Sequence, residues 1–287
     1  YMANNVSVIA APLVSGTLGQ KVGWHYGFGA AGVVMVIGLI IYLAGRPFLP
    51  PDERPTREER ETREKLSRGD WLCVLYLVIL IPVLAIALLT NQEIFNAYLI
   101  WGDQHFDLRF MDYTMPSSWL ITLDATLSFS MLVAVAAFWK WWGSRRREPD
   151  EISKMIIGSV FTIAGGLCLF MAALTQPEGG KIGLFWPFMF HLLNSIGFAH
   201  ILPISLALFS KIAPRQINAT VIGLYYLAFF LANYTVGQIG QLYSDPNVST
   251  PTFWLIHVAS AAFGLVAFVL FKMAIGKRFA GEAPARA

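Results

Sequence analysis

Long apolar runs alternate with short polar or charged segments along the whole chain. Each run is long enough to cross about 30 Å of hydrocarbon as a helix, which takes about 20 residues. A helix satisfies its backbone polar groups within the segment, which is necessary because lipid offers no hydrogen-bond partners. The pattern therefore predicts an all-α membrane protein with about eight spans, at residues 2–20, 24–45, 71–103, 116–139, 153–175, 183–210, 216–241 and 252–274.

The composition supports this interpretation and excludes an ordinary soluble domain. Of the 287 residues, 56% are hydrophobic and 14% are charged, whereas a soluble domain carries about 25% charged residues. The mean hydropathy is +0.56. A lipid bilayer is therefore the expected environment of the chain, and nucleic acid is not an expected partner.

Lysine and arginine are concentrated in alternate loops, and this pattern predicts the orientation of the helices. The positively charged loops are 46–69, 140–154 and 211–215, and each intervening loop contributes one such residue or none. An excess of positive charge marks the cytoplasmic side of a membrane protein. We therefore expect a multi-pass protein of the inner (cell) membrane with a cytoplasmic C-terminus.

One long charged segment divides the chain into unequal parts. Residues 46–69 are predicted to be a cytoplasmic linker between residues 1–45, the last two helices of an N-terminal bundle, and residues 70–275, a six-helix C-terminal bundle. Residues 276–287 would form a cytoplasmic tail. Transporters built from repeated helix bundles have this organisation. Because Tyr1 lies within an apolar run, we expect the sequence to be a fragment that lacks upstream helices.

The third predicted span contains the largest set of polar side chains. Polar and charged groups inside a bilayer are costly, so they are functional candidates. A carboxylate there can exchange a proton, because removal from water raises its pKa and a nearby cation lowers it. The alternative, that the stretch meets water at the outer interface, is favoured for Asp103 but not for Glu93. Four residues follow helical spacing and are predicted to share one face: Glu93, Asn96, Ile100 and Asp103.

Two other spans place titratable side chains within the membrane. Asp124 lies about two turns into the fourth span, where it either takes part in function with a partner on another helix or forms a structural hydrogen bond. In the sixth span, His191 and Asn194 share a face with Phe198, whereas His200 points away. Histidine titrates near neutral pH, so His191 is a functional candidate, with a packing role as the alternative.

The last two spans contain further polar residues. Tyr225 and Asn233 either contact a ligand or form hydrogen bonds between helices. Trp254 and His257 are predicted to be anchors at the membrane interface. The sequence contains no glycine-rich phosphate loop, GxSxG, HExxH or paired cysteine motif. No enzyme activity, cofactor or metal site is therefore predicted.

Five motifs occur along the chain in one order: YMANNVSVIAAPLVSGTLGQKVGWHYGFGAAGVVMVIGLIIY, NQEIFNAYLIWGDQHFDL, MPSSWLITLDA, GFAHILPISLALFSKIAP and NATVIGLYYLAFFLANYTVG. In sequence and order they resemble motifs of the proton-dependent oligopeptide transporters of the major facilitator superfamily. The first motif is the most specific. The resemblance implies a major-facilitator fold, in which the eight predicted helices correspond to helices 5–12 of twelve.

The resemblance also implies roles for particular residues. Glu93 lies within one residue of the position at which the family has a proton-coupling glutamate. The chain departs from the family at Phe198, where the family has a glutamate that binds the amino group of the peptide. His191 and Asn194, on the same face of the predicted helix, would provide alternative polar contacts to a substrate. Five residues would line the central cavity: Asn5, Glu93, Asp124, Tyr225 and Asn233.

We therefore expect a secondary active transporter that carries di- or tripeptides, or related small solutes, together with protons by alternating access. Its partners would be a small-molecule substrate, protons and the lipid bilayer. One alternative is a major-facilitator transporter of a non-peptide solute. Alternatives of another class are an integral-membrane enzyme and a scaffold subunit.

Overall fold

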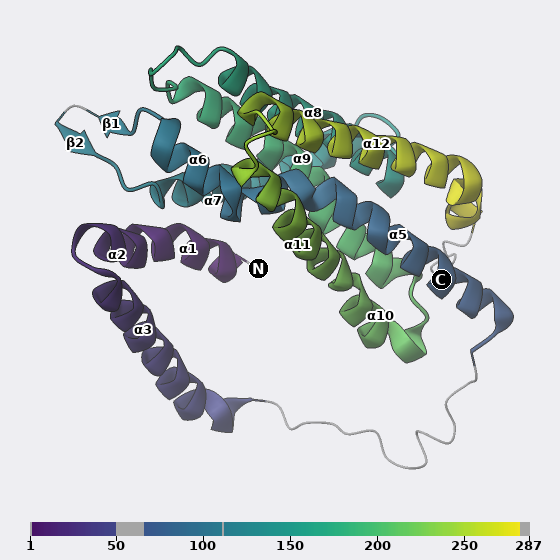
Figure 1. The fold of residues 1–287 in the computed structure, drawn as a ribbon. Helices are drawn as coiled ribbons and strands as arrows, with labels where there is room; N and C mark the ends of the chain where they lie inside the picture. The colour runs from purple at the N-terminus through teal and green to yellow at the C-terminus, as the bar shows by residue number, and fades with distance from the viewer. Residues whose placement is uncertain (1, 50–65, 111, 282–287) are drawn as a thin grey trace.

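The computed structural model describes residues 2–49, 66–110 and 112–281. The first part is a helical arm of α1 (Met2–Ala11), the π-helical segment η1 (Pro12–Gly16), α2 (Thr17–Lys21), α3 (Trp24–Gly45) and η2 (Arg46–Phe48). The chain turns at Gly23, just before α3. The φ of Gly23 is 151°, a backbone conformation that residues with a side chain rarely adopt. Figure 1 shows α3 extending away from the other helices, and its residues are mostly exposed.

The second part is a bundle of antiparallel helices joined by short loops (Figure 1). Its elements are α5 (Arg68–Gln92), η3 (Glu93–Phe95), α6 (Ala97–His105), α7 (Trp119–Gly143), α8 (Glu151–Leu174), α9 (Phe185–Ile212), η4 (Arg215–Ile217), α10 (Asn218–Tyr225), α11 (Leu227–Gly240), η5 (Gln241–Ser244) and α12 (Thr250–Gly281). A short antiparallel hairpin, β1 (Arg109–Phe110) and β2 (Tyr113–Thr114), lies between α6 and α7. The pattern of apolar and polar residues does not predict this hairpin.

Local capping interactions define where two of the bundle helices begin. The Ser67 hydroxyl accepts a hydrogen bond from the Asp70 backbone N–H, and the Asp70 carboxylate accepts one from the Ser67 backbone N–H, which forms a capping box. At the start of α8, Asp150 accepts a hydrogen bond from the Ser153 N–H. Such caps satisfy N–H groups that have no partner within the helix.

Helices α8 and α9 approach closely because small residues line their contact. A Cβ atom at Gly158 would lie 2.7 Å from Cβ of His200, and a Cβ atom at Gly197 would lie 2.8 Å from the backbone oxygen of Gly158. Glycine at both positions therefore allows the two backbones to meet, as in other membrane helix pairs. Helix α12 packs on α8 and α5, and α11 packs on α5.

The helical arm contacts the bundle mainly through α7. The indole N–H of Trp119 donates to the hydroxyl of Thr17 over 2.8 Å, and the amide of Gln20 donates to Ser117 over 2.9 Å. These bonds hold the start of α7 against α2.

The all-α membrane class is confirmed, with differences from the predicted spans. Seven helices in the described part of the chain are long and apolar enough to cross a membrane. Residues 2–21 are helical, but a π-helical segment divides them into shorter elements. The third predicted span is broken near Asn96, and the last helix extends to Gly281, into the predicted tail. Most of the predicted linker, residues 50–65, lies outside the described residues.

Candidate functional site

The backbone break after α5 positions the first acidic side chain. Asn96 has φ −125° and ψ −119°, which is not helical, and its amide donates to the backbone oxygen of Val236 on α11 over 3.2 Å. The break interrupts the helix between Glu93 and α6. The predicted common face of Glu93, Asn96, Ile100 and Asp103 is therefore wrong.

Glu93 is fully buried within the bundle. Its Oε1 accepts a hydrogen bond from the backbone N–H of Ala97 over 3.0 Å, at the first turn of α6. A carboxylate at this point satisfies a free N–H and faces the positive end of the helix dipole. Its Oε2 lies 3.0 Å from Nε2 of His257 on α12, and both side chains are 0% exposed.

The prediction that His257 and Trp254 anchor the chain at the membrane interface is wrong. Both residues are buried, at 0% and 1% exposure. His257 lies seven residues into α12, a depth of about 10 Å at 1.5 Å per residue. An ionisable ring at that depth in an apolar run indicates a polar partner inside the bundle.

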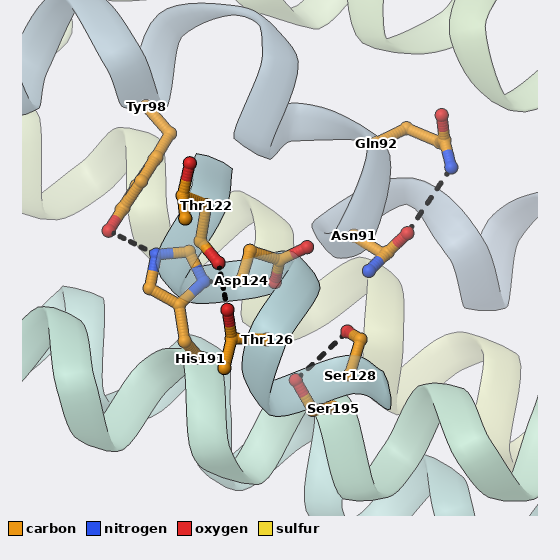
Figure 2. A network of polar contacts seen from close by, with 9 residues as sticks. All are labelled: Asn91, Gln92, Tyr98, Thr122, Asp124, Thr126, Ser128, His191 and Ser195. Atoms are coloured by element: carbon orange, nitrogen blue, oxygen red, sulfur yellow. Dashed lines mark hydrogen bonds and ion pairs between the residues drawn. The ribbon is translucent and has the colours of Figure 1, made fainter. Parts of the chain in front are cut away.

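A second buried group joins three helices (Figure 2). Nδ1 of His191 on α9 lies 2.9 Å from Oδ1 of Asp124 on α7. Nε2 of the same ring lies 2.7 Å from the hydroxyl of Tyr98 on α6. Tyr98 and His191 are 0% exposed and Asp124 is 7% exposed. We call Tyr98, His191 and Asp124 the buried triad. Asp124 and His191 are among the residues predicted from the sequence, whereas Tyr98 is not.

Further buried polar residues lie on α7 and α9, the helices that carry Asp124 and His191. The hydroxyls of Ser128 and Ser195 are hydrogen-bonded over 3.1 Å, as Figure 2 shows. Asn194 is 1% exposed, and its Nδ2 has no hydrogen-bond partner within the described part of the chain. A buried amide of this kind is a ready donor to water or to a ligand.

The remaining predicted site residues are placed differently. Tyr225 is buried, and its hydroxyl is hydrogen-bonded to Ser205 over 3.0 Å and to the Leu202 carbonyl over 3.2 Å. Asn233 is exposed and donates to the Phe229 carbonyl of its own helix. The side chain of Asn5 lies outside the described residues. The structure therefore does not bring Tyr225 or Asn233 together with the buried triad.

Two cavities lie where the helical arm meets the bundle. One of about 820 Å³ is lined by charged residues that include Lys21, Arg109 and Lys181. The other, of about 620 Å³, is more apolar and lies between the arm and α6 and α7. Asp103 lines both cavities. It is exposed, in agreement with the alternative that this stretch meets water at the outer interface. Glu93 lines neither of them.

No metal-binding cluster is present among the described residues, since no three His, Cys, Asp or Glu side chains are suitably grouped there. The polar groups of the site instead form acid–histidine pairs, one in the buried triad and one between Glu93 and His257. Such pairs can bind and release protons.

Residues 1–237 match the family model of the Major Facilitator Superfamily. The peptide transporter YePEPT of Yersinia enterocolitica is 24% identical over 96% of this chain and 66% of its own length. A di-/tripeptide transporter of Lactococcus lactis subsp. cremoris is 19% identical over 93% of this chain and 66% of its own length. The chain thus spans slightly less than two thirds of these relatives.

Solved structures agree on the fold. A crystal structure of a mutant peptide transporter POT in complex with alafosfalin matches with a TM-score of 0.80 and 20% identity, over 97% of this chain and 66% of the other. A structure of the same kind of transporter in complex with sulfate matches with a TM-score of 0.78 and 19% identity, over the same shares. These relatives and neighbours are transporters and not enzymes. The chain therefore belongs to the Major Facilitator Superfamily, and its resemblance to the oligopeptide transporters within that superfamily is confirmed.

Proposed function

We propose that the chain is part of a proton-coupled symporter that moves di- or tripeptides, or related small solutes, by alternating access. The observation that carries the proposal is the buried triad. It links α6, α7 and α9 through an acid, an imidazole and a phenol that are almost fully removed from water. A scaffold subunit has no need for such costly buried groups.

Protonation of the buried triad would change a charge at the contact between α7 and α9. With a neutral His191, the triad carries the negative charge of Asp124, and one added proton neutralises it. Moving a two-state equilibrium from 1:99 to 99:1 requires about 5.5 kcal/mol.

The cavities support a small polar substrate. Their volumes of about 620 and 820 Å³ fall within the range of about 300–1,000 Å³ that small-molecule sites occupy. Asp103, exposed to both, is a carboxylate available to a substrate ammonium group. Phe198, where the family has a glutamate, favours the second candidate, a non-peptide solute on the same fold.

The proposed setting is the inner membrane, with the C-terminus in the cytoplasm. The positive charge of alternate loops supports this orientation. Lys154, Lys211 and Lys272 lie near one end of the bundle, where they pair with Glu148, Glu151 and Asp150.

Uptake measurements with the intact protein in liposomes test the proposal. A labelled dipeptide should accumulate when the proton concentration is higher outside, and unlabelled di- and tripeptides should compete for uptake. If a non-peptide solute competes and peptides do not, the second candidate is correct. If a proton gradient leaves the uptake of every transported solute unchanged, the symport proposal is wrong.

A further inference from the structure

Three consecutive arginines follow directly after the end of α7. Residues 141–147 read WWGSRRR and lead from the last turn of the helix into the loop before α8. The backbone N–H groups of Arg145 and Arg146 both donate to the carbonyl of Trp142, over 3.0 and 2.8 Å. These bonds hold the arginines beside the end of the helix, and we call residues 141–147 the arginine turn.

Two of the arginines lie over tryptophan rings of the same turn. The guanidinium carbon of Arg145 is 4.9 Å from the ring centroid of Trp141, and that of Arg146 is 5.1 Å from the ring centroid of Trp142. A guanidinium at such a distance is attracted to the face of the ring. The contact positions the charge, while the guanidinium N–H groups have no hydrogen-bond acceptor in the part of the chain that the structure describes.

The acidic residues of the same loop are paired with other cations. Each forms an ion pair with a lysine of α8, α9 or α12: Glu148 with Lys154, Glu151 with Lys211 and Asp150 with Lys272. Among the described residues, no acidic side chain pairs with Lys140 or with the three arginines. Their positive charges are therefore uncompensated, and all four side chains are exposed.

Exposed aromatic side chains place the arginine turn at the level of the lipid headgroups. Helix α7 is long and apolar enough to span a membrane and ends at Gly143. In its last two turns, Phe138 is 43% and Trp141 is 49% exposed. Tryptophan rings are enriched at the boundary between hydrocarbon and headgroups. An arginine just beyond that boundary meets phosphate groups, to which a guanidinium can donate two parallel hydrogen bonds.

We propose that the arginine turn binds the phosphate headgroup of an anionic phospholipid. The proposal goes beyond the transport function, because the partner is a component of the bilayer and not the substrate. Uncompensated cations favour a headgroup with a net negative charge, such as phosphatidylglycerol, over phosphatidylcholine, whose choline group is itself positive. The exposed rings of Phe138 and Trp141 favour a lipid over free phosphate, because only a lipid has acyl chains that cover them.

Native mass spectrometry of the intact protein, titrated with phosphatidylglycerol or with phosphatidylcholine of the same acyl chains, tests the proposal. A basic residue close to an anionic surface strengthens binding roughly fivefold. The wild type should therefore bind phosphatidylglycerol roughly tenfold more tightly or better. The triple variant Arg145→Gln, Arg146→Gln and Arg147→Gln should lose this preference. Equal affinity of the wild type for the two lipids, or an unchanged preference in the triple variant, overturns the proposal.

Two further variants separate the arginine turn from charge in general. Lys21→Gln, Arg109→Gln and Lys181→Gln together remove three positive charges around the cavity at the opposite end of α7, and this protein should keep the preference. An equal loss there would show that net charge decides, which overturns the proposal. Trp141→Leu keeps every charge but removes the ring beneath Arg145, and should reduce the preference roughly two- to fivefold. It decides the question if the triple variant does not fold, and an unchanged preference would contradict the proposed site.

Inorganic phosphate distinguishes a lipid site from a site for the free anion. Added to the complex with phosphatidylglycerol, it should displace no more lipid than acetate does at the same ionic strength. Preferential displacement by phosphate would show that the arginine turn binds the free anion, and would overturn the assignment to a lipid.

Discussion

Nδ1 of His191 lies 2.9 Å from Oδ1 of Asp124, and the two side chains come from helices α9 and α7. The ring is completely buried, and the phenol of Tyr98 occupies its other nitrogen. The pair therefore joins two helices of one bundle through side chains that are almost fully removed from water.

Asp124→Asn should greatly reduce proton-driven uptake while the protein still folds. Asparagine keeps an oxygen that can accept from Nδ1 of His191, but it removes the charge that changes on protonation. Asp124→Ala removes the partner altogether and should lower stability by about 3–5 kcal/mol, the usual effect of breaking a buried pair. Uptake in liposomes and thermal unfolding in detergent measure the two effects. Asp112→Asn, in the exposed hairpin loop, is the control, and an equal loss of uptake in that variant would contradict a specific role.

Tyr98→Phe should destabilise the protein by about 1–3 kcal/mol, because the fully buried Nε2 of His191 loses its hydrogen-bond partner. The ring itself still fills the same space among Phe106, Phe190 and Trp254. The midpoint of thermal unfolding measures the loss. Tyr26→Phe removes a hydroxyl from a residue that is 65% exposed and should have no measurable effect. Equal midpoints for the two variants would show that the phenol has no part in the buried triad.

Gly197→Ala should separate α8 from α9 and lower stability by about 1–3 kcal/mol through overpacking. A methyl group there would overlap the Thr162 side chain and the backbone of Gly158. Because His191 and Asn194 lie one to two turns away on α9, uptake should fall as well. Gly237→Ala, where an added Cβ meets no atom within 4 Å, is the matched control. A Gly197→Ala protein as stable as this control would contradict the close packing.

The pair between Asp150 and Lys272 predicts a pH-dependent contribution to stability. Burial alone would raise the pKa of Asp150, but hydrogen bonds and charge from Lys272, with hydrogen bonds from Ser153, lower it below its ordinary value. A carboxyl whose pKa is lower in the folded state stabilises the protein above its unfolded pKa of about 3.9, and this contribution is lost as the pH falls through the folded value. Because the Asp150 side chain is 47% exposed, the effect should be small.

Asp150→Asn isolates this effect, because asparagine can still cap α8. The variant should unfold at a slightly lower temperature than the wild type at neutral pH, and the difference should disappear in acid. A difference that persists unchanged in acid would show that the charge of Asp150 is not its cause.

The sequence was sufficient to predict the helices, because apolar length and loop charge are local properties. It also identified Asp124, His191 and Glu93 as buried candidates, since ionisable groups are conspicuous in apolar runs. The break at Asn96 was not predictable, because it depends on a hydrogen bond to α11 from a distant part of the chain. The partners Tyr98 and His257 were missed for a similar reason. Which faces of two helices meet is set by close contacts such as Gly158 with Gly197, and helical spacing alone does not reveal them.

The most direct test of the account is a measurement of proton movement driven by peptide. Liposomes that contain the intact protein and a pH-sensitive dye are given a dipeptide gradient without an initial pH difference. The account predicts that the interior becomes acidic as the dipeptide enters, and that Asp124→Asn abolishes this acidification. Entry of the dipeptide without any change in internal pH would contradict it.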